Sequence, residues 1–126
     1  MKPQALIVED NKFNIEVLET LLEQEGLESI TLENPRELEN TVASIPNLRI
    51  VFLDLELPNY DGLEIHEEIQ HWDELAGIPI VAYTVHTSEI DVVRKSGFHS
   101  FLGKPLRPEL FSDQLARILD GVHVWE

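Results

Sequence analysis

The chain has no cysteine, which excludes disulfide bonds, thiol catalysis and cysteine-ligated metal sites. Basic residues are also few: nine Lys and Arg stand against 24 Asp and Glu, for a formal net charge of −15. Such a charge repels nucleic acid and anionic membrane surfaces and favours cations and basic partners, so no direct nucleic-acid binding is expected. The sequence contains no apolar run of membrane-spanning length, and its first residues do not resemble a signal peptide. We therefore expect a cytoplasmic protein that does not bind membranes.

The 126 residues are 43% hydrophobic, which is typical of a globular protein able to bury a core. At this length one domain is the expected number. The sequence shows no internal repeat, low-complexity segment or linker. We therefore expect a single domain over residues 1–126, in which residues 121–126 form a short C-terminal tail.

An apolar run that ends on an acidic residue lies near the middle of the chain. Residues 50–53 read Ile-Val-Phe-Leu, a pattern typical of a strand buried on both faces of a parallel sheet. The run ends at Asp54, and Pro58, Asn59 and Gly62 then predict a loop. A carboxylate at the carboxyl end of such a strand lies where open α/β sheets bind their ligands. On this stretch alone, Asp54 could equally be a residue that caps a turn.

Strand and helix patterns alternate along the rest of the chain. Strands are expected over 5–8, 27–32, 50–53, 78–83 and 99–102, and helices over 12–25, 35–45, 63–72, 88–96 and 108–119. In the last helix, Leu110 and Phe111 are both expected to be buried. Fivefold alternation predicts a parallel sheet with right-handed crossovers and helices on both faces. The expected fold class is a doubly wound, flavodoxin-like α/β sheet with strand order 2-1-3-4-5.

Polar residues follow four of the five expected strands. Glu9 and Asp10 follow the first strand, Asp54 the third, Thr84 the fourth and Lys104 the fifth. Because the carboxyl ends of parallel strands share one edge of the sheet, we expect three carboxylates to meet there beside a hydroxyl and an ammonium group. Carboxylates this close repel one another unless a cation or protons intervene, and oxygen ligands with room for water suit Mg²⁺. We therefore expect a magnesium site at this edge.

This arrangement also suits phosphoryl chemistry. A carboxylate such as Asp54 can act as a nucleophile and form an aspartyl phosphate. The bound cation and Lys104 would neutralise the charge that develops on the phosphoryl oxygens. Taken singly, each of these residues has an ordinary structural explanation, as a helix cap, a strand end or a solvated lysine. Together, at the ends of four strands, they indicate a site.

The chain resembles the receiver domain of two-component response regulators, in particular stand-alone, chemotaxis-regulator-like receivers. The resemblance covers nearly the whole chain and rests on Glu9-Asp10, on Asp54 with Pro58 and Asp61-Gly62 behind it, on Thr84, and on Phe101-Leu102-Gly103-Lys104-Pro105. It implies that a histidine kinase or a histidine phosphotransfer protein donates a phosphoryl group to Asp54. It also implies a signalling protein, not an enzyme, that catalyses only its own phosphorylation and slow dephosphorylation.

The resemblance implies roles for the residues around Asp54. Mg²⁺ would be held by Asp10, Asp54, the backbone carbonyl of Glu56 and, through water, Glu9. On phosphorylation, Thr84 would hydrogen-bond the phosphoryl oxygen and Lys104 would pair with it.

A switch is also implied, in which Phe101 rotates inward as Thr84 moves to the phosphate. This would remodel the strand-four loop, strand five and the face of the last helices. The alternative is that Phe101 only packs in the core.

The sequence departs from the family pattern after Thr84. Many receivers have a small residue next, whereas Val85 and His86 follow here, and Glu56 adds negative charge at the mouth of the site. We expect these residues to affect the lifetime of the phosphoryl group. The segment 84–97 is slightly shorter than in typical receivers, so the usual partner geometry at that surface is the least secure part of the resemblance.

The histidines and the second tryptophan receive no role in the site. The histidines lack the spacing of a metal site, and most are expected at the surface: His66, His71, His86, His99 and His123. Trp125 could belong to a free tail or could anchor a partner.

Three functions remain as alternatives. The first is a stand-alone receiver whose output is a protein contact, since no effector domain follows Leu119, unless the chain is a fragment of a larger protein. A homodimer, the cognate kinase and the downstream partner are left open. The second is a small phosphatase of the haloacid-dehalogenase type with Asp54 as nucleophile, because Glu56 lies two residues further on. In that family the nucleophile normally ends the first strand, which here carries Glu9 and Asp10. The third is a degenerate receiver that binds its partner constitutively.

Overall fold

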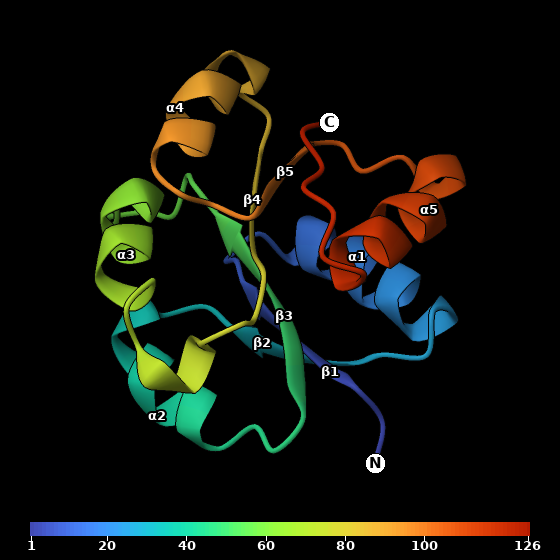
Figure 1. Cartoon of the computed structure of the whole chain (residues 1–126), viewed down its shortest axis with the longest axis horizontal. Helices are drawn as coiled ribbons and strands as arrows, with labels where there is room; N and C mark the ends of the chain where they lie inside the picture. The colour runs from blue at the N-terminus through green and yellow to red at the C-terminus, as the bar shows by residue number, and fades with distance from the viewer.

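The computed structural model describes residues 1–126 and has a parallel β-sheet between two layers of helices (Figure 1). The five strands are β1 (Gln4–Val8), β2 (Glu28–Leu32), β3 (Leu48–Asp54), β4 (Ile80–Thr84) and β5 (Ser100–Gly103). Their order in the sheet is β2-β1-β3-β4-β5, and all neighbours are parallel. The predicted fold class and strand order are therefore confirmed.

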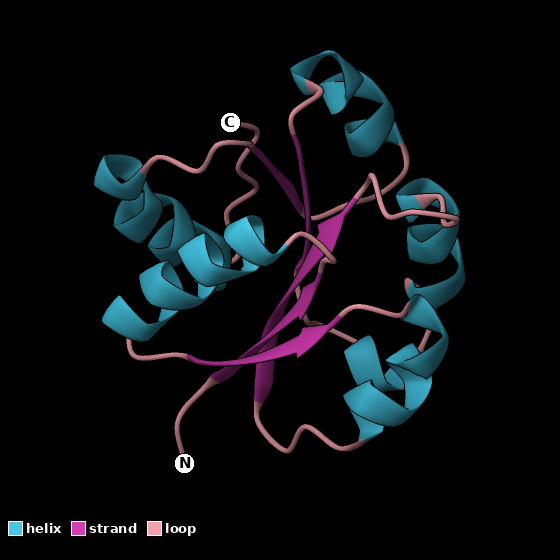
Figure 2. Ribbon diagram, turned by 180° about the vertical axis from the view of Figure 1, so that it is seen from behind, coloured by secondary structure: helices cyan, strands magenta, loops and turns pink.

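Helices cover both faces of this sheet, as Figures 1 and 2 show from opposite sides. They are α1 (Lys12–Gln24), α2 (Leu38–Ala43), α3 (Gly62–Ile69), α4 (Ile90–Lys95) and α5 (Pro108–Leu119). Helices α1 and α5 lie on one face, and α2, α3 and α4 lie on the other. No helix combines the length and the apolar character needed to cross a membrane.

The hydrophobic core is divided by the sheet into two parts. Because successive side chains of a strand point to opposite faces, Ile50 and Phe52 of β3 pack toward α1 and α5, whereas Val51 and Leu53 pack toward α2, α3 and α4. All four of these side chains are fully buried. Burial on both faces explains why the central strand reads as a continuous apolar run.

Several expected helices differ from the observed ones in length or phase. The helix expected over 63–72 ends at Ile69, and the helix expected over 88–96 is a 3₁₀ turn (Thr87–Glu89) followed by the six-residue α4. The prediction that Leu110 is buried was wrong, since it is 36% exposed. In α5 the buried face is formed by Phe111, Leu115 and Ile118, whose spacing places Leu110 one step off that face.

The C-terminal segment expected as a short tail over 121–126 packs against the edge strand β5 through an isolated bridge. The Phe101 N–H of β5 donates to the carbonyl oxygen of Val124 at 2.7 Å, and the Glu126 N–H donates to that of Phe101 at 2.9 Å. Trp125 pairs with Phe101 in a parallel bridge, and the Arg94 guanidinium of α4 lies 5.0 Å from the centroid of its ring. Trp125 is therefore held by its own chain.

One histidine is a core residue, in contrast to the surface position expected for most of them. His66 of α3 is 1% exposed, and its ring stacks on Phe98 with 3.8 Å between centroids. Its Nδ1 atom is buried without a hydrogen-bond partner. Burial, with a smaller contribution from His71, lowers the pKa of His66 to about 4.

This burial predicts a loss of stability in acid. The neutral imidazole is the form that fits the core. The stability that His66 contributes in this form is complete above the pKa of about 6.5 in the unfolded chain, and it is lost as the pH falls toward the folded pKa. Relative to wild type, His66→Leu should gain about 2–3 kcal/mol in unfolding free energy between about pH 7 and about pH 4.5. Urea unfolding at both pH values measures this difference. Equal pH dependence of wild type and His66→Leu would contradict the prediction.

Candidate functional site

The strand ends place the expected site residues at one edge of the sheet. Glu9 directly follows β1 and is fully buried, and Asp54 is the last residue of β3 and is 3% exposed. Both strands lie side by side in the centre of the sheet, with Val8 opposite Leu53. Asp10 is half-buried next to Glu9.

The loop after Asp54 is folded back tightly onto the strand. Asp61 caps α3, since its Oδ1 atom accepts a hydrogen bond from the Leu63 N–H at 2.9 Å. Gly62 begins the helix so close to β3 that a Cβ atom there would lie 2.6 Å from the Leu55 Cα. Glycine is therefore required at this position, and the close packing fixes where the loop leaves Asp54.

Three carboxyl groups converge at this edge. Glu9, Asp10 and Asp54 each offer an oxygen such that all of these atoms lie within 4.8 Å of one another. The Oε2 atom of Glu9 accepts hydrogen bonds from the backbone N–H groups of Asp10 and Asn11, at 2.9 and 3.3 Å. The backbone N–H of Glu56 donates to Asp54 Oδ1 at 3.0 Å. A group of oxygen donors of this kind fits a hard divalent cation such as Mg²⁺.

Lys104 provides a buried positive charge beside these acids. Its Nζ atom lies 2.9 Å from Glu9 Oε1 and 3.1 Å from Asp54 Oδ1, and its side chain is only 8% exposed. The Lys104 backbone N–H donates to the carbonyl oxygen of Thr84 at 2.9 Å, which ties this loop to the end of β4. The Lys104–Pro105 peptide bond is cis.

The charges perturb one another because they are buried together. Burial, and next the neighbouring Glu9, raises the pKa of Asp54 to about 7. Burial acts in the same direction on Glu9, but hydrogen bonds with Asp54 and Lys104 outweigh it and lower the pKa of Glu9 to about 2. Burial and the charge of Glu9 also raise the pKa of Asp10. Without a divalent cation, Asp54 is therefore the member of the buried pair that holds a proton near neutral pH.

Thr84 contacts Glu56, whose side chain was expected at the mouth of the site, and His86, which follows it in the sequence. Its hydroxyl group donates a hydrogen bond to Glu56 Oε1, and its Oγ1 atom accepts one from the His86 N–H at 3.2 Å. The His86 ring also reaches Glu56, with Nε2 3.3 Å from Oε2. Glu56 follows β3, whereas His86 follows β4, and no spacing pattern in the sequence indicated that the two side chains meet.

Phe101 lies away from the acids, on the other face of the sheet. Its side chain is fully buried in the core under α2, α3 and α4, together with Ala82 of β4. Val85 is 54% exposed beside the site. In this structure the Phe101 ring is therefore already buried in the core.

Tyr83 is a polar contact of the site that the sequence did not predict. It is 1% exposed, and its hydroxyl group donates to Glu9 Oε1 at 3.0 Å. Burial and the charge of Glu9 raise its pKa well above the usual range, so the hydroxyl group stays protonated. The signal available in the sequence was its position directly before Thr84 at the carboxyl end of a strand; in the structure it lies opposite Asp54 in the register of β3 and β4.

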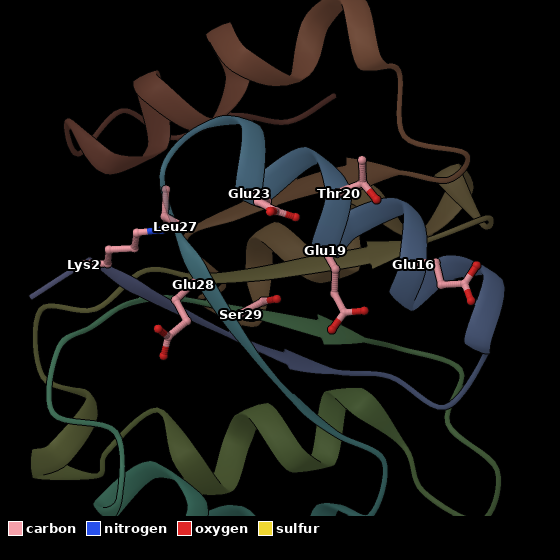
Figure 3. A pocket seen from close by; sticks show the side chains of 8 residues that line it. All are labelled: Lys2, Glu16, Glu19, Thr20, Glu23, Leu27, Glu28 and Ser29. Carbon is pink, nitrogen blue, oxygen red and sulfur yellow. The ribbon is translucent and has the colours of Figure 1, made fainter.

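A second group of acidic residues lies apart from this site, on α1 and β2. Figure 3 shows Glu16, Glu19 and Glu23 along α1 and Glu28 on β2, around a hollow that Lys2 also lines. None of these side chains belongs to the group formed by Glu9, Asp10 and Asp54. They contribute to the net charge of −15. The candidate site is therefore the group of Glu9, Asp10 and Asp54 at the edge of the sheet.

Comparison with known protein families identifies this arrangement. The sequence model of the response regulator receiver domain matches residues 5–116. The chain belongs to the receiver domain family. The resemblance based on the strand-end residues is therefore confirmed, and this receiver domain is placed among the proteins of two-component signalling.

Relatives of this receiver domain include whole proteins and parts of larger ones. The polar-differentiation response regulator DivK of Brucella anthropi is 30% identical over 122 residues, which cover 94% of this chain and 98% of DivK. The sensor histidine kinase GacS of Pseudomonas protegens is 32% identical over 122 residues, which cover 93% of this chain but 13% of the kinase.

Solved structures show the same fold. The chemotaxis response regulator CheY4 of Vibrio cholerae has a TM-score of 0.81 at 22% identity, covering 94% of this receiver domain and 99% of that chain. A putative response regulator from Chloroflexus aurantiacus has a TM-score of 0.84 at 22% identity, covering 95% and 99%.

Proposed function

We propose that this receiver domain accepts a phosphoryl group on Asp54 from a histidine kinase or a histidine phosphotransfer protein. The observation that supports this most is the position of Lys104 Nζ, 2.9 Å from Glu9 and 3.1 Å from Asp54, beside Asp10. A carboxylate nucleophile, further acidic oxygens for a cation and an ammonium group are the components that phosphoryl transfer to aspartate requires. We treat residues 1–126 as a single receiver domain that acts in the cytoplasm.

Asp54 is the nucleophile in this proposal. One of its carboxyl oxygens attacks phosphorus while the bond from phosphorus to the donor histidine nitrogen breaks. The buried position of Asp54, held by the Glu56 N–H, leaves it little freedom to move, which favours a fixed line of attack. Lys104 remains beside the new phosphoryl group and offsets part of its negative charge.

Mg²⁺ fits the acidic residues of this receiver domain. Asp10, Asp54, the backbone carbonyl of Glu56 and, through water, Glu9 would hold it. When bound, it supplies positive charge that stabilises the phosphoryl oxygens during transfer. Ionised Asp54 is also the nucleophilic form, and a nearby cation favours it over the protonated form.

Signalling in this proposal begins at Thr84. For its hydroxyl group to hydrogen-bond a phosphoryl oxygen, it must first leave Glu56, so Glu56 and His86 hold the unphosphorylated arrangement. The movement of Thr84 then changes the space available to Phe101 on the neighbouring strand, where it faces Ala82 in the register. The changed face of β4, α4, β5 and α5 would bind a downstream protein or a second copy of the chain.

Labelling with a small phosphoryl donor tests the proposal. After treatment with acetyl phosphate and Mg²⁺, intact mass spectrometry should show the mass of one phosphoryl group on the wild type and none on Asp54→Asn. The isosteric amide keeps the shape of the side chain but is a poor nucleophile. Asp61→Asn is the matched control, because asparagine can also cap α3, and it should be labelled like the wild type.

The alternatives give different results in the same experiment. Equal labelling of Asp54→Asn and wild type would show that Asp54 is not the acceptor. Continuous turnover of phosphoesters would favour a haloacid-dehalogenase-type phosphatase, whereas a receiver is labelled once and hydrolyses slowly. No labelling of the wild type, with partner binding in the absence of phosphate, would favour a degenerate receiver.

A further inference from the structure

Tyr83 contacts both Glu9 and Lys104 of the site. It is the residue before Thr84 in β4 and lies opposite Asp54 in the register of the two strands. Its hydroxyl group donates to Glu9 Oε1 at 3.0 Å, and its ring lies under Lys104, with Nζ 4.3 Å from the centroid. A single buried side chain therefore contacts two of the charged groups that the proposed function uses.

The alternation of side chains along the strands explains how this contact arises. Tyr83 points to the same face of the sheet as Val81, where it packs in the core beside Phe52 of β3. The two aromatic rings meet edge to face, with 6.3 Å between centroids. The tyrosine side chain is long enough to pass the end of β3 and reach Glu9 after β1. Packing on all sides fixes the position of its hydroxyl group.

The hydrogen bonds of Glu9 are divided between its two oxygens. Oε2 accepts the backbone N–H groups of Asp10 and Asn11, which belong to the loop that carries the other acid. Oε1 accepts the Tyr83 hydroxyl group and Lys104 Nζ. Because Lys104 is shared with Asp54 at 3.1 Å, Tyr83 is the donor that belongs to Glu9 Oε1 alone.

We propose that Tyr83 is a positioning residue for the phosphoryl-transfer site of this receiver domain, with separate roles for its two ends. The hydroxyl group holds the Glu9 carboxylate in the orientation in which it faces the cation position. The ring supports Lys104 between Glu9 and Asp54 through a cation–π contact. This inference rests on the proposed function, because it concerns the same acids and the same lysine.

Two substitutions separate the roles. Tyr83→Phe keeps the ring and removes only the hydroxyl group, so the Mg²⁺ affinity should fall by about 10-fold, as is usual when a partner that orients a metal ligand is lost. At saturating Mg²⁺, the rate of labelling by acetyl phosphate should stay within about 3-fold of wild type. Tyr83→Leu removes the ring as well, and its labelling rate at saturating Mg²⁺ should fall by at least about 10-fold, because Lys104 is no longer held in place.

The affinity is measured without any phosphoryl donor, by following backbone amide chemical shifts in a Mg²⁺ titration. Tyr60→Phe is the matched control: its hydroxyl group contacts Asn34 at 3.3 Å, away from the acids, and its removal should leave the affinity unchanged. A purely structural role for Tyr83 would lower the unfolding free energy of Tyr83→Phe and leave its Mg²⁺ affinity equal to wild type. That result would overturn the inference. If Tyr83→Leu does not fold, the titration of Tyr83→Phe decides alone.

The outcomes for the wild type distinguish this inference from the function on which it rests. A wild type that binds Mg²⁺ and is labelled, together with a Tyr83→Phe variant that matches it in affinity, overturns the inference and leaves the function intact. A wild type that neither binds Mg²⁺ nor is labelled overturns both. Weakened Mg²⁺ binding by Tyr83→Phe supports the positioning role.

Discussion

Asp54→Asn is expected to make the protein more stable at about pH 8 in the absence of Mg²⁺, by about 2–4 kcal/mol of unfolding free energy, while it removes the proposed phosphoryl acceptor. The reason is the burial of Asp54 beside Glu9, which raises its pKa to about 7. The folded protein therefore binds a proton at Asp54 more tightly than the unfolded chain does. The stabilising effect of that proton is present below the unfolded pKa of about 3.9 and is lost as the pH rises toward the folded value. Asparagine carries no charge and avoids this loss.

Urea unfolding at about pH 8 and about pH 4 measures the effect, and the gain should nearly vanish at the lower pH, where Asp54 is protonated in the folded state and about half protonated in the unfolded chain. Adding Mg²⁺ should narrow the gap at pH 8, because the cation stabilises the wild-type site by binding to the folded state. Asp61→Asn serves again as the exposed control and should change stability little. A decrease in stability of Asp54→Asn at high pH would show that the acids do not repel one another in the folded protein.

Lys104→Met should strongly lower the unfolding free energy, in contrast to the gain expected for Asp54→Asn. Lys104 is the buried cation between Glu9 and Asp54, and its removal leaves two carboxyl groups facing each other without compensation. Removing one partner of a buried ion pair typically costs about 3–5 kcal/mol, and we expect a loss of this size at about pH 8 without Mg²⁺. The loss should be smaller at about pH 5, because without the lysine both carboxyl groups have raised pKa values and become protonated more readily. Mg²⁺ should restore part of the stability.

A double-mutant cycle provides the strictest check on this prediction. Lys104→Met combined with Asp54→Asn removes one positive and one negative charge, so the double variant should lose less unfolding free energy than the sum of the two single-variant changes predicts. Lys95→Met on α4 is the control for removing an exposed lysine. Additive effects in the cycle, or a Lys104→Met variant as stable as wild type at about pH 8, would contradict the geometry described for the site.

The sheet and the meeting of the acids could be predicted from the sequence because both follow from simple periodicity. Alternating strand and helix patterns imply parallel strands, and parallel strands bring residues that follow them to one edge. Glu9, Asp10, Asp54 and Lys104 each lie within one or two residues of a strand end, so their proximity depends on topology alone. Thr84 was placed at the same edge by the same argument.

The contacts that were not predicted depend on side-chain length and packing. Whether the Tyr83 hydroxyl group reaches Glu9 depends on the distance across β3, which no spacing in the sequence encodes. The contact between Thr84 and Glu56 depends on the conformations of two loops. His66 became a core residue because Phe98 supplies a ring on which it stacks, a partner 32 positions further along the chain.

The C-terminal segment has a consequence for self-association. Val124 and Glu126 pair with the outward backbone groups of Phe101 at the β5 edge of the sheet, whereas β2 forms the opposite edge. An exposed edge strand can pair with a strand of another molecule and so extend the sheet from one chain to the next. On this side the hollow beside β2 is ringed by Glu16, Glu19, Glu23 and Glu28. A neighbouring molecule that approached in the same way would bring equal charges against them, so electrostatic repulsion disfavours extension of the sheet from this edge.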